Sequence, residues 1–416
     1  MKELRVLYQG RGQSLWLGTL ADDGADIIFQ YSSEALAAGV ELSPLRLPLR
    51  AHAYPDHQRD YLDLMRVPGL LFDSLPDGWG MVLMERRLRA KGIDIAGLSV
   101  LDRLAYLGAN TMGALTYEPA DPANIAGRDL SIVELAAEMR ELLEDDSHAV
   151  LAELARVGGS PGGARPKAVT YFNAGTGAMS THAHRVAGAA PWLFKFPAKE
   201  DASDSCALEE VYARMARRCD LGMEPTTFIA MDDGLSAFGS RRFDRTDNGE
   251  RVHVHSLSSL LHANFRLPSL GYTELLQATR RLTRDQREVT KALQRCVFNV
   301  VMNNRDDHAK NFSFMLDADH HWTLAPPYDL TWAPGNRGEH FMDVAGEGKA
   351  PRREHVLTVA RAGGLKAADA AIVIDSMLDQ LTAAALREEA AGLPVRPATI
   401  KAVIATIDAN RSRIKA

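Results

Sequence analysis

Cysteine is scarce in this chain, with only Cys206, Cys219 and Cys296 among 416 residues. Their wide spacing does not fit a disulfide framework or a cysteine-based zinc site. No apolar run approaches the ~20 residues that span a bilayer. The N-terminal sequence "MKELRVLYQGRG" has charges where a secretory signal would have its apolar core. We therefore expect a cytoplasmic protein that does not cross a membrane.

An excess of positive charge is also lacking, since the formal net charge is −6. The surface as a whole therefore does not predict direct binding to nucleic acid. The basic stretch "TRRLTRDQR" (279–287) is typical of a solvated helix face, with phosphate binding as the alternative. A hydrophobic content of 46% and a charged content of 25% indicate an ordinary globular protein, and the length predicts two or three domains.

The order of predicted elements divides the chain into a β-rich part and a helical part. Short strands separated by Gly- and Asp-rich breaks fill residues 3–30, and further strands are predicted at 168–172, 192–197 and 226–243. From about residue 250 the apolar spacing is largely helical. This order favours an α+β protein with two lobes.

A dense polar cluster, "NNRDDHAKNFSF" (303–314), lies between apolar stretches. The apolar stripe before it predicts a buried helix that ends near Met302. The alternating residues after it, followed by "WTLAPPYDL", predict a hairpin of two strands. Such a hairpin would return Asp329 beside Asn311, so that both converge with Asp306.

The residue types in this cluster suit phosphoryl transfer. Asn311 and Asp329 offer two oxygen ligands, which a hard cation such as Mg²⁺ prefers. Asp306 is a separate carboxylate that could accept a hydroxyl proton. In the alternative interpretation the cluster is a helix C-cap followed by a polar turn, with Asp329 capping an element of its own.

Two features upstream could bind phosphate groups. The loop "GGSPGGARPK" (158–167) has glycines that let backbone N–H groups approach an anion, and Lys167 adds charge. Lys195 interrupts the apolar strand "WLFKFP", which is costly unless the lysine is paired or faces a ligand. Glu209 or Glu210 on the next predicted helix is its candidate partner. The alternatives are a flexible surface loop and an edge-strand lysine that extends to solvent.

Taken together, these motifs resemble the HipA family of serine/threonine protein kinases, the toxins of HipA–HipB modules. The resemblance covers nearly the whole chain. It implies a kinase-like two-lobed α+β fold, with a β-rich N-terminal subdomain (1–120), a kinase N-lobe (121–248) and a helical C-lobe (249–416). The matching segments are "VLYQG", "LGTL", "FQYSSEAL", "ELSPLRLPL", "LFDSLPDGWG", "GGSPGGARPK", "FKFP", "RRFDR", "RDDHAKN" and "PPYDL".

The resemblance also implies roles for individual residues. Asp306 would be the catalytic base, and Asn311 and Asp329 would bind Mg²⁺. Ser160 would be an autophosphorylated serine that switches the kinase off, although here Pro161 follows it. The nucleotide-binding residues implied by the resemblance are Gly162, Gly163, Ala164, Arg165 and Lys167 of the loop, Lys195 with Glu210, Arg241, Arg242 and Phe243 along the adenine, His308, Asn311, and Tyr328 with Asp329. His308 and Lys310 would line the phosphate end and act as catalytic residues together with Asp306.

By the same resemblance, the chain would be an ATP- and Mg²⁺-dependent kinase that arrests growth by phosphorylating a translation component such as an aminoacyl-tRNA synthetase. Its partner would be a HipB-like helix-turn-helix antitoxin, which would supply any contact with DNA.

Three other functions stay open on the sequence. One is a small-molecule phosphotransferase on the same lobes. Another is a nucleotide-binding partner of an antitoxin without catalysis. The last is a zinc hydrolase, which the spacing of the histidines does not favour. The histidines considered for that site are His253, His255, His308, His320 and His321.

Overall fold

The computed structural model describes residues 1–55, 59–121, 128–145, 149–159 and 162–416. The chain separates into two compact units, and each is described by itself. The first comprises Met1–Cys206, Pro225–His255 and Ser259–His262, and the second comprises Ala207–Glu224, Ser256–Ser258 and Ala263–Ala416. The predicted division at residues 120 and 248 stays a prediction.

The first unit begins with an antiparallel sheet of order β4-β3-β2-β1-β5. In β1, Leu4 and Val6 are buried while Glu3 and Arg5 are exposed, the alternation of a half-buried strand. A register shift between Val6 and Leu7 breaks that alternation, so both side chains are buried. The strands are β1 (Lys2–Tyr8), β2 (Leu15–Asp22), β3 (Ile27–Tyr31), β4 (Tyr54–Pro55) and β5 (Leu115–Glu118).

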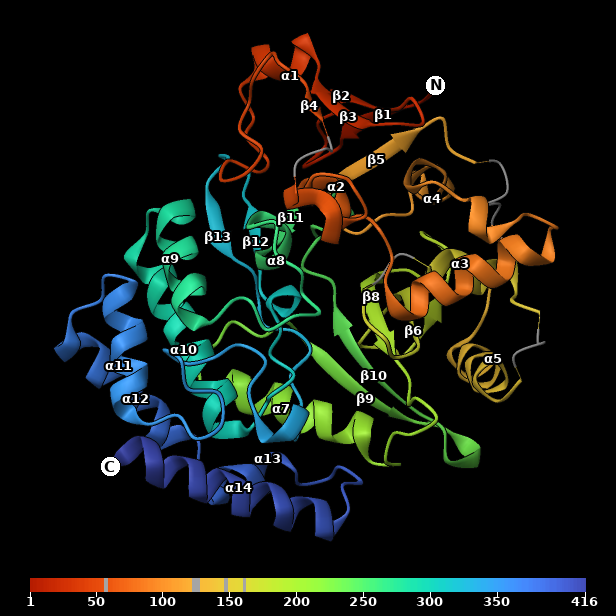
Figure 1. Cartoon of the computed structure of the whole chain (residues 1–416). Coiled ribbons are helices and arrows are strands. Elements are labelled where there is room, and N and C mark those ends of the chain that lie inside the picture. Colours follow the sequence, from red (N-terminus) through yellow and green to blue (C-terminus); the bar gives the residue numbers. More distant parts are fainter. Residues whose placement is uncertain (56–58, 122–127, 146–148, 160–161) are drawn as a thin grey trace. The chain divides into compact units, whose positions relative to one another are not determined.

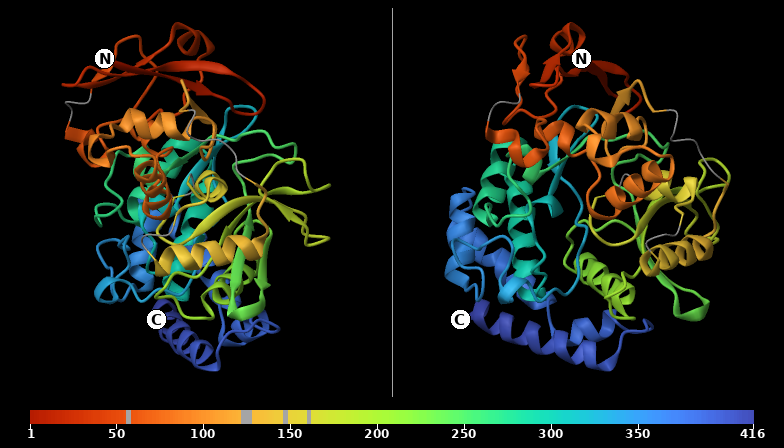
Figure 2. Two further views of the ribbon diagram at one scale, coloured as in Figure 1. Left: turned by 90° about the vertical axis from the view of Figure 1, so that its right-hand side faces the viewer. Right: turned by 45° about the vertical axis from the view of Figure 1, so that its right-hand side comes forward.

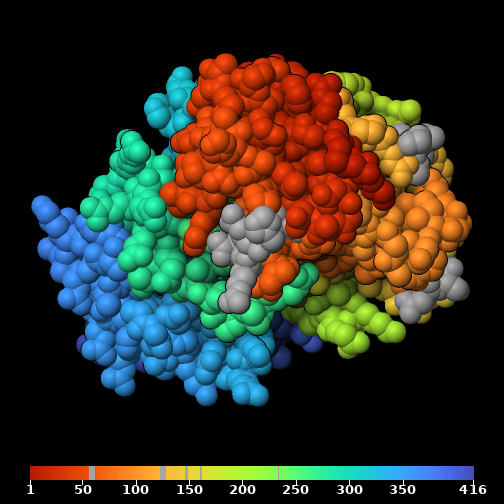
Figure 3. Space-filling view, turned by 45° about the horizontal axis from the view of Figure 1, so that its top comes forward, coloured from red at the N-terminus to blue at the C-terminus, as the bar shows by residue number. Residues whose placement is uncertain are grey.

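Short helices accompany this sheet, and its first strands lie side by side near the N-terminus (Figures 1 and 2). The N-terminal residues (red) form a continuous surface in the space-filling view (Figure 3). The helices are α1 (Ser33–Ala38), η1 (Arg59–Leu64), α2 (Gly69–Phe72), α3 (Gly78–Ala90), η2 (Ile95–Gly97) and α4 (Val100–Leu107).

A second antiparallel sheet, of order β7-β6-β8-β10-β9, carries the core of the predicted N-lobe. Phe172 packs edge-on against Trp192 and Phe194, and Leu135 and Met139 of α5 join the same buried cluster. The elements are α5 (Ile132–Glu144), α6 (Ala152–Gly158), β6 (Lys167–Phe172), β7 (Met179–Ser180), β8 (Ala190–Lys195), β9 (Thr226–Ala230), η3 (Asp232–Gly234) and β10 (Ser236–Arg241). Strand β11 (Val254–Ser256) follows along the chain and is not part of this sheet.

A buried ion cluster joins the two sheets of the first unit. Asp244 accepts two hydrogen bonds from Arg242, at 2.8 and 2.7 Å, and one from Arg245 at 2.8 Å. The backbone N–H of Gly113, just before β5, donates to the same carboxylate at 2.8 Å. Burial opposes ionisation of Asp244, but the two arginines outweigh it and hold its pKa well below the ordinary value. The "RRFDR" segment therefore has a structural role as well as its predicted place along the adenine.

In the second unit, α10 is the central helix, and α9, α11, α12 and α14 pack against it. Its last eleven residues except Gln294 are buried, so nearly every side of this part of the helix faces the core. Within the described residues no helix has the length and apolar character needed to cross a bilayer. The elements are α7 (Ser205–Arg218), α8 (Leu257–Leu260), α9 (Tyr272–Thr283), α10 (Gln286–Met302), η4 (Ala309–Asn311), β12 (Ser313–Leu316), β13 (Trp322–Leu324), η5 (Asn336–Gly338), α11 (Arg353–Ala362), α12 (Ala367–Gln380), α13 (Ala383–Glu389) and α14 (Pro397–Lys415).

The ion cluster predicts a large loss of stability for Asp244→Asn. The substitution leaves two buried arginines without their carboxylate, which costs about 3–5 kcal/mol in comparable buried pairs. Chemical denaturation measures the free energy of unfolding. Asp247→Asn is the matched control, because Asp247 pairs with the neighbouring Arg241 at the surface, and it should change stability little. Equal, small effects of both substitutions would contradict a structural role for the cluster.

His262 predicts a pH dependence of stability. Its Nε2 accepts the N–H of Gly69 at 3.2 Å, and burial, with smaller effects of His255 and Arg46, lowers its pKa to about 3. Below the unfolded pKa of about 6.5 the unfolded chain takes up a proton that the folded chain refuses, so stability falls as the pH drops from 6.5 toward 3. At pH 5 the loss is about 2 kcal/mol. Denaturation of His262→Gln should lack this part of the pH dependence, whereas exposed His320→Gln should retain it. An unchanged pH profile in His262→Gln would refute the assignment.

Candidate active site

The polar loop starts where α10 ends, as the sequence predicts. Asn303 caps the helix in the left-handed conformation (φ 56°), which asparagine tolerates better than most residues. The last carbonyls of the helix are satisfied from other helices of the same unit. The side-chain amide of Asn410 donates to Val300 O at 2.9 Å, and the hydroxyl of Tyr212 donates to Met302 O at 2.6 Å. These contacts fix the point from which the loop departs.

Within the loop, Asp306 and Asn311 are tied together. Asp306 is exposed and Asn311 is partly buried. The Nδ2 of Asn311 donates to the backbone carbonyl of Asp306 at 2.8 Å, and its backbone N–H donates to His308 O at 2.8 Å. Because the amide nitrogen of Asn311 is engaged in this way, its side-chain oxygen is the atom that remains for a cation.

Asp307 behaves differently from its neighbour Asp306. Its side chain is completely buried and accepts hydrogen bonds from Tyr272, His340 and Phe341. No role was predicted for Asp307, although two adjacent carboxylates in an extended loop must point in different directions. That geometry was the only available signal that one of the two would be structural.

The predicted residues His308 and Lys310 lie beside aromatic rings. The His308 ring is 5.8 Å from Phe265 and 5.9 Å from Phe341, between centroids. Its Nδ1 is buried and has no hydrogen-bond partner among the described groups. The Lys310 ammonium is 4.8 Å from the Phe265 ring centroid, a distance at which the ring face attracts a cation.

The predicted hairpin is present and returns the chain to this loop. Strand β12 pairs antiparallel with β13. Beyond it, the Tyr328 hydroxyl donates to Lys310 O at 2.7 Å and lies 2.6 Å from Ser313 Oγ. Tyr328 directly precedes Asp329, and Lys310 directly precedes Asn311. The hydrogen bond between Tyr328 and Lys310 therefore joins the backbone positions next to the two metal-ligand candidates, Asn311 and Asp329. Asp329 itself has φ 57°, an uncommon conformation that concentrates at functional sites.

In the first unit, the two predicted phosphate-binding lysines face each other. Lys167 on β6 is the register partner of Lys195 on β8, and both are buried. Like charges directly opposite each other on neighbouring strands are destabilising unless something offsets them. Lys195 also lies 5.8 Å from the ring centroid of Phe238, its register partner on the other side. The pairing therefore concentrates positive charge on one face of the sheet.

The described part of the glycine-rich loop is held by its neighbours. Gly163 donates its N–H to the carboxylate of Asp77 and accepts from the N–H of Trp79 at 3.0 Å. Lys167 Nζ donates to Gly162 O at 2.5 Å. Arg165 forms a two-bond ion pair with Asp201, at 2.8 and 3.0 Å. Ala164 is exposed, and the predicted phosphorylation site Ser160, with Pro161, lies outside the described residues.

The remaining predicted nucleotide contacts have partners of their own. Glu210 is buried, and its Oε1 accepts from Arg214 at 2.9 Å and from Arg217 at 3.2 Å. The backbone N–H groups of Arg241 and Arg242 donate to Pro225 O and Pro191 O.

Phe243, the last of the predicted adenine contacts, lies between Arg242 and Asp244 of the ion cluster. This cluster fixes the backbone on either side of it. The adenine-binding role of residues 241–243 stays a prediction.

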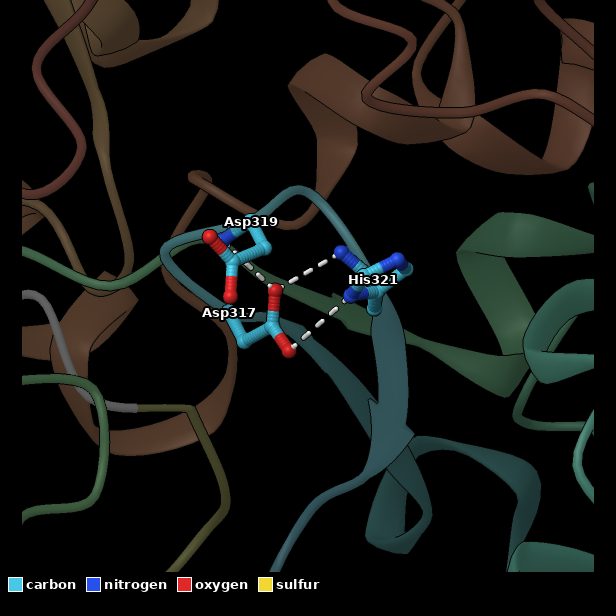
Figure 4. A group of neighbouring side chains, drawn as sticks. All are labelled: Asp317, Asp319 and His321. Atoms are coloured by element: carbon cyan, nitrogen blue, oxygen red, sulfur yellow. Dashed lines mark hydrogen bonds and ion pairs between the residues drawn. The ribbon is translucent and has the colours of Figure 1, made fainter.

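Two of the histidines considered for a zinc site have hydrogen-bond partners of their own. His253 and His255 are buried, and the Nε2 of each lies 2.9 Å from Leu42 O and Ser43 Oγ respectively. His321 does lie with Asp317 and Asp319 at the turn of the β12–β13 hairpin (Figure 4). One oxygen of Asp317 accepts the backbone N–H groups of both other residues, so the group is first of all a hydrogen-bonded turn.

Two family models match this chain. A family model of the HipA-like C-terminal domain matches residues 159–385, and one of the HipA N-terminal domain matches residues 11–118. A search of curated protein sequences gave no match.

Among solved structures, the chain is similar to one in the Shewanella oneidensis MR-1 toxin–antitoxin complex of HipA, HipB and operator DNA. The alignment has a TM-score of 0.73 and 16% identity, and covers 99% of this chain and 97% of the other. The Helicobacter pylori proinflammatory kinase CtkA aligns over 61% of this chain and 90% of its own, with a TM-score of 0.44 and 13% identity, a likeness too weak to support a conclusion.

The first alignment confirms the expected fold class, a two-lobed, kinase-like α+β architecture. The C-terminal family model spans more than half of the chain by itself, and the N-terminal model precedes it in the expected order. This chain belongs to the HipA family.

Proposed function

We propose that the protein is an ATP- and Mg²⁺-dependent serine/threonine protein kinase that acts as the toxin of a toxin–antitoxin pair. One observation carries the proposal. Asn311 is hydrogen-bonded to the Asp306 carbonyl, and Tyr328 ties the residue before Asp329 to the same loop. A proton acceptor and two oxygen ligands on one short framework are what phosphoryl transfer to a hydroxyl requires.

The roles of the residues follow from their chemistry. Asp306 accepts the proton of the substrate hydroxyl, whose oxygen forms a bond to the γ-phosphorus of ATP as the bond to the β,γ-bridging oxygen breaks. Asn311 and Asp329 offer the oxygen atoms that Mg²⁺ prefers, and the ion, when bound, neutralises charge that develops on the phosphate oxygens. Lys167 and Lys195 bind phosphate oxygens as point charges.

A protein substrate and a HipB-like antitoxin are part of the proposal. The similar Shewanella structure contains HipB and operator DNA, and a net charge of −6 favours a basic partner for any contact of this chain with DNA. A translation component such as an aminoacyl-tRNA synthetase is the proposed substrate class, and Ser160 is the proposed site of autophosphorylation.

The base assignment predicts a specific kinetic defect in Asp306→Asn. Phosphate transfer should slow by about 10²–10⁴-fold, the usual contribution of a general base. Affinity for ATP should change little, because the substitution spares the lysines and the metal ligands. Rapid-quench kinetics and calorimetry measure the two quantities. Asp319→Asn, an exposed carboxylate on the hairpin turn, is the control and should behave as wild type. Wild-type rates in Asp306→Asn would refute the assignment.

The lysine pair predicts a loss of nucleotide affinity. Replacing Lys195 or Lys167 with Met should weaken ATP binding by about tenfold, because each ammonium group contributes charge to the phosphate-binding face. The double variant should lose less affinity than the sum of the single losses, since both lysines bind one phosphate chain.

Lys199→Met is the matched control for the pair, because Lys199 is exposed. It should leave both the affinity and the melting temperature unchanged. Lowered stability together with unchanged ATP affinity in Lys195→Met would show that the lysines are structural.

A further inference from the structure

The segment after Asp329, residues 333–349, is fastened to the catalytic loop at its start. Ala333 donates its backbone N–H to Asn303 O at 3.1 Å, and the side-chain amide of Asn303 returns a bond to Ala333 O at 2.9 Å. Asn304 forms a parallel bridge with the same residue. The start of the segment is therefore paired with the start of the catalytic loop.

Arg305 holds the middle and the end of the segment. Its guanidinium donates to Gly338 O and, at 3.1 Å, to Lys349 O, eleven residues apart in the chain. Its own carbonyl accepts the N–H of Phe341 at 3.2 Å. The close approach constrains the chain: a Cβ on Gly335 would lie 2.9 Å from the Arg305 Cβ, and Gly335 has φ 70°.

Asp307 holds the segment from the buried side. One carboxylate oxygen accepts the N–H of Phe341 at 2.8 Å, and the other lies 2.8 Å from Nδ1 of His340. The Tyr272 hydroxyl donates to the second oxygen at 2.6 Å, and Asn299 donates to that hydroxyl at 2.9 Å. Burial and the neighbouring Asp307 charge raise the pKa of Tyr272 well above its ordinary value, so the hydroxyl stays a donor.

Other protein kinases commonly order the segment after the metal-binding aspartate by phosphorylating it, and new arginine–phosphate pairs then hold it. Here Arg305, directly before the proposed base, is already bound to two backbone carbonyls. Between residues 330 and 350 the sequence has one hydroxyl side chain, Thr331. Hydrogen bonds from Arg305 to the backbone therefore order this segment, a task that arginine–phosphate pairs perform in other kinases.

We infer that Arg305 and Asp307 are positioning residues that keep residues 333–349, and with them Asp306, in the active arrangement without phosphorylation of this segment. The inference rests on the proposed kinase function. Arg305 and Asp307 are the chain neighbours of Asp306, each joined to it by one peptide bond. If the segment loses its hydrogen bonds to Arg305 and Asp307, the position of Asp306 therefore becomes less well defined.

Hydrogen exchange measured by mass spectrometry tests the anchoring directly, without reference to activity. In full-length Arg305→Met, amides of 335–349 should exchange on the order of tenfold faster, as expected when a hydrogen-bonded anchor is lost, while those of α10 stay unchanged. Lys349→Gln keeps the backbone carbonyl and removes only an exposed charge, so it should match wild type. Wild-type exchange in Arg305→Met would overturn the inference. Asp307→Asn keeps an acceptor for Phe341 and is the milder second variant if Arg305→Met does not fold.

Kinetics separate positioning from nucleotide binding. In Arg305→Met, kcat should fall by about tenfold or more with little change in KM for ATP, because a misplaced base slows the chemical step. Phosphatase-treated wild type should keep its full rate. Loss of that rate, with phosphate found on Thr331 before treatment, would overturn the inference. If wild type transfers no phosphate at all, the proposed function fails, and the exchange experiment still decides whether the anchor exists.

Discussion

The C-terminal end of α10 is the feature on which the rest of the site depends. A helix buried on nearly every side cannot leave its last carbonyls without partners, because no water reaches them. Asn410 and Tyr212 supply hydrogen bonds to Val300, Val301 and Met302. Asn303 then turns the chain in a left-handed conformation. The direction of the polar loop is thus set by a core requirement before any catalytic residue is reached.

From that turn the loop divides its polar residues between two environments. Asp306 faces outward and Asp307 lies in the core. The buried carboxylate is acceptable only because it receives several hydrogen bonds, since an unpaired buried charge is costly. Those bonds reach Tyr272 and the segment after Asp329. Of the two adjacent aspartates, Asp306 is therefore the proposed base, and Asp307 is the buried anchor that supports it.

Much of this could be predicted from the sequence. The spacing of apolar residues predicted α10 and the hairpin β12–β13, and "RDDHAKN" with "PPYDL" predicted which loop ends come together. The opposition of Lys167 and Lys195 could not be read from the sequence, because strand register depends on pairing partners that local patterns do not specify. The buried ion cluster around Asp244 could not be predicted from the sequence for a similar reason. Its partner Gly113 is 131 residues away, and nothing in "RRFDR" distinguishes an adenine-facing arginine from one bound to a buried aspartate.

The most direct test of the central claim is transfer of the labelled γ-phosphate of ATP, with Mg²⁺, to a host lysate separated into protein and low-molecular-mass fractions. The account predicts acid-stable label on serine or threonine of a protein, abolished by a metal chelator. Label found only in the small-molecule fraction, or in neither fraction while ATP still binds, would contradict a protein kinase.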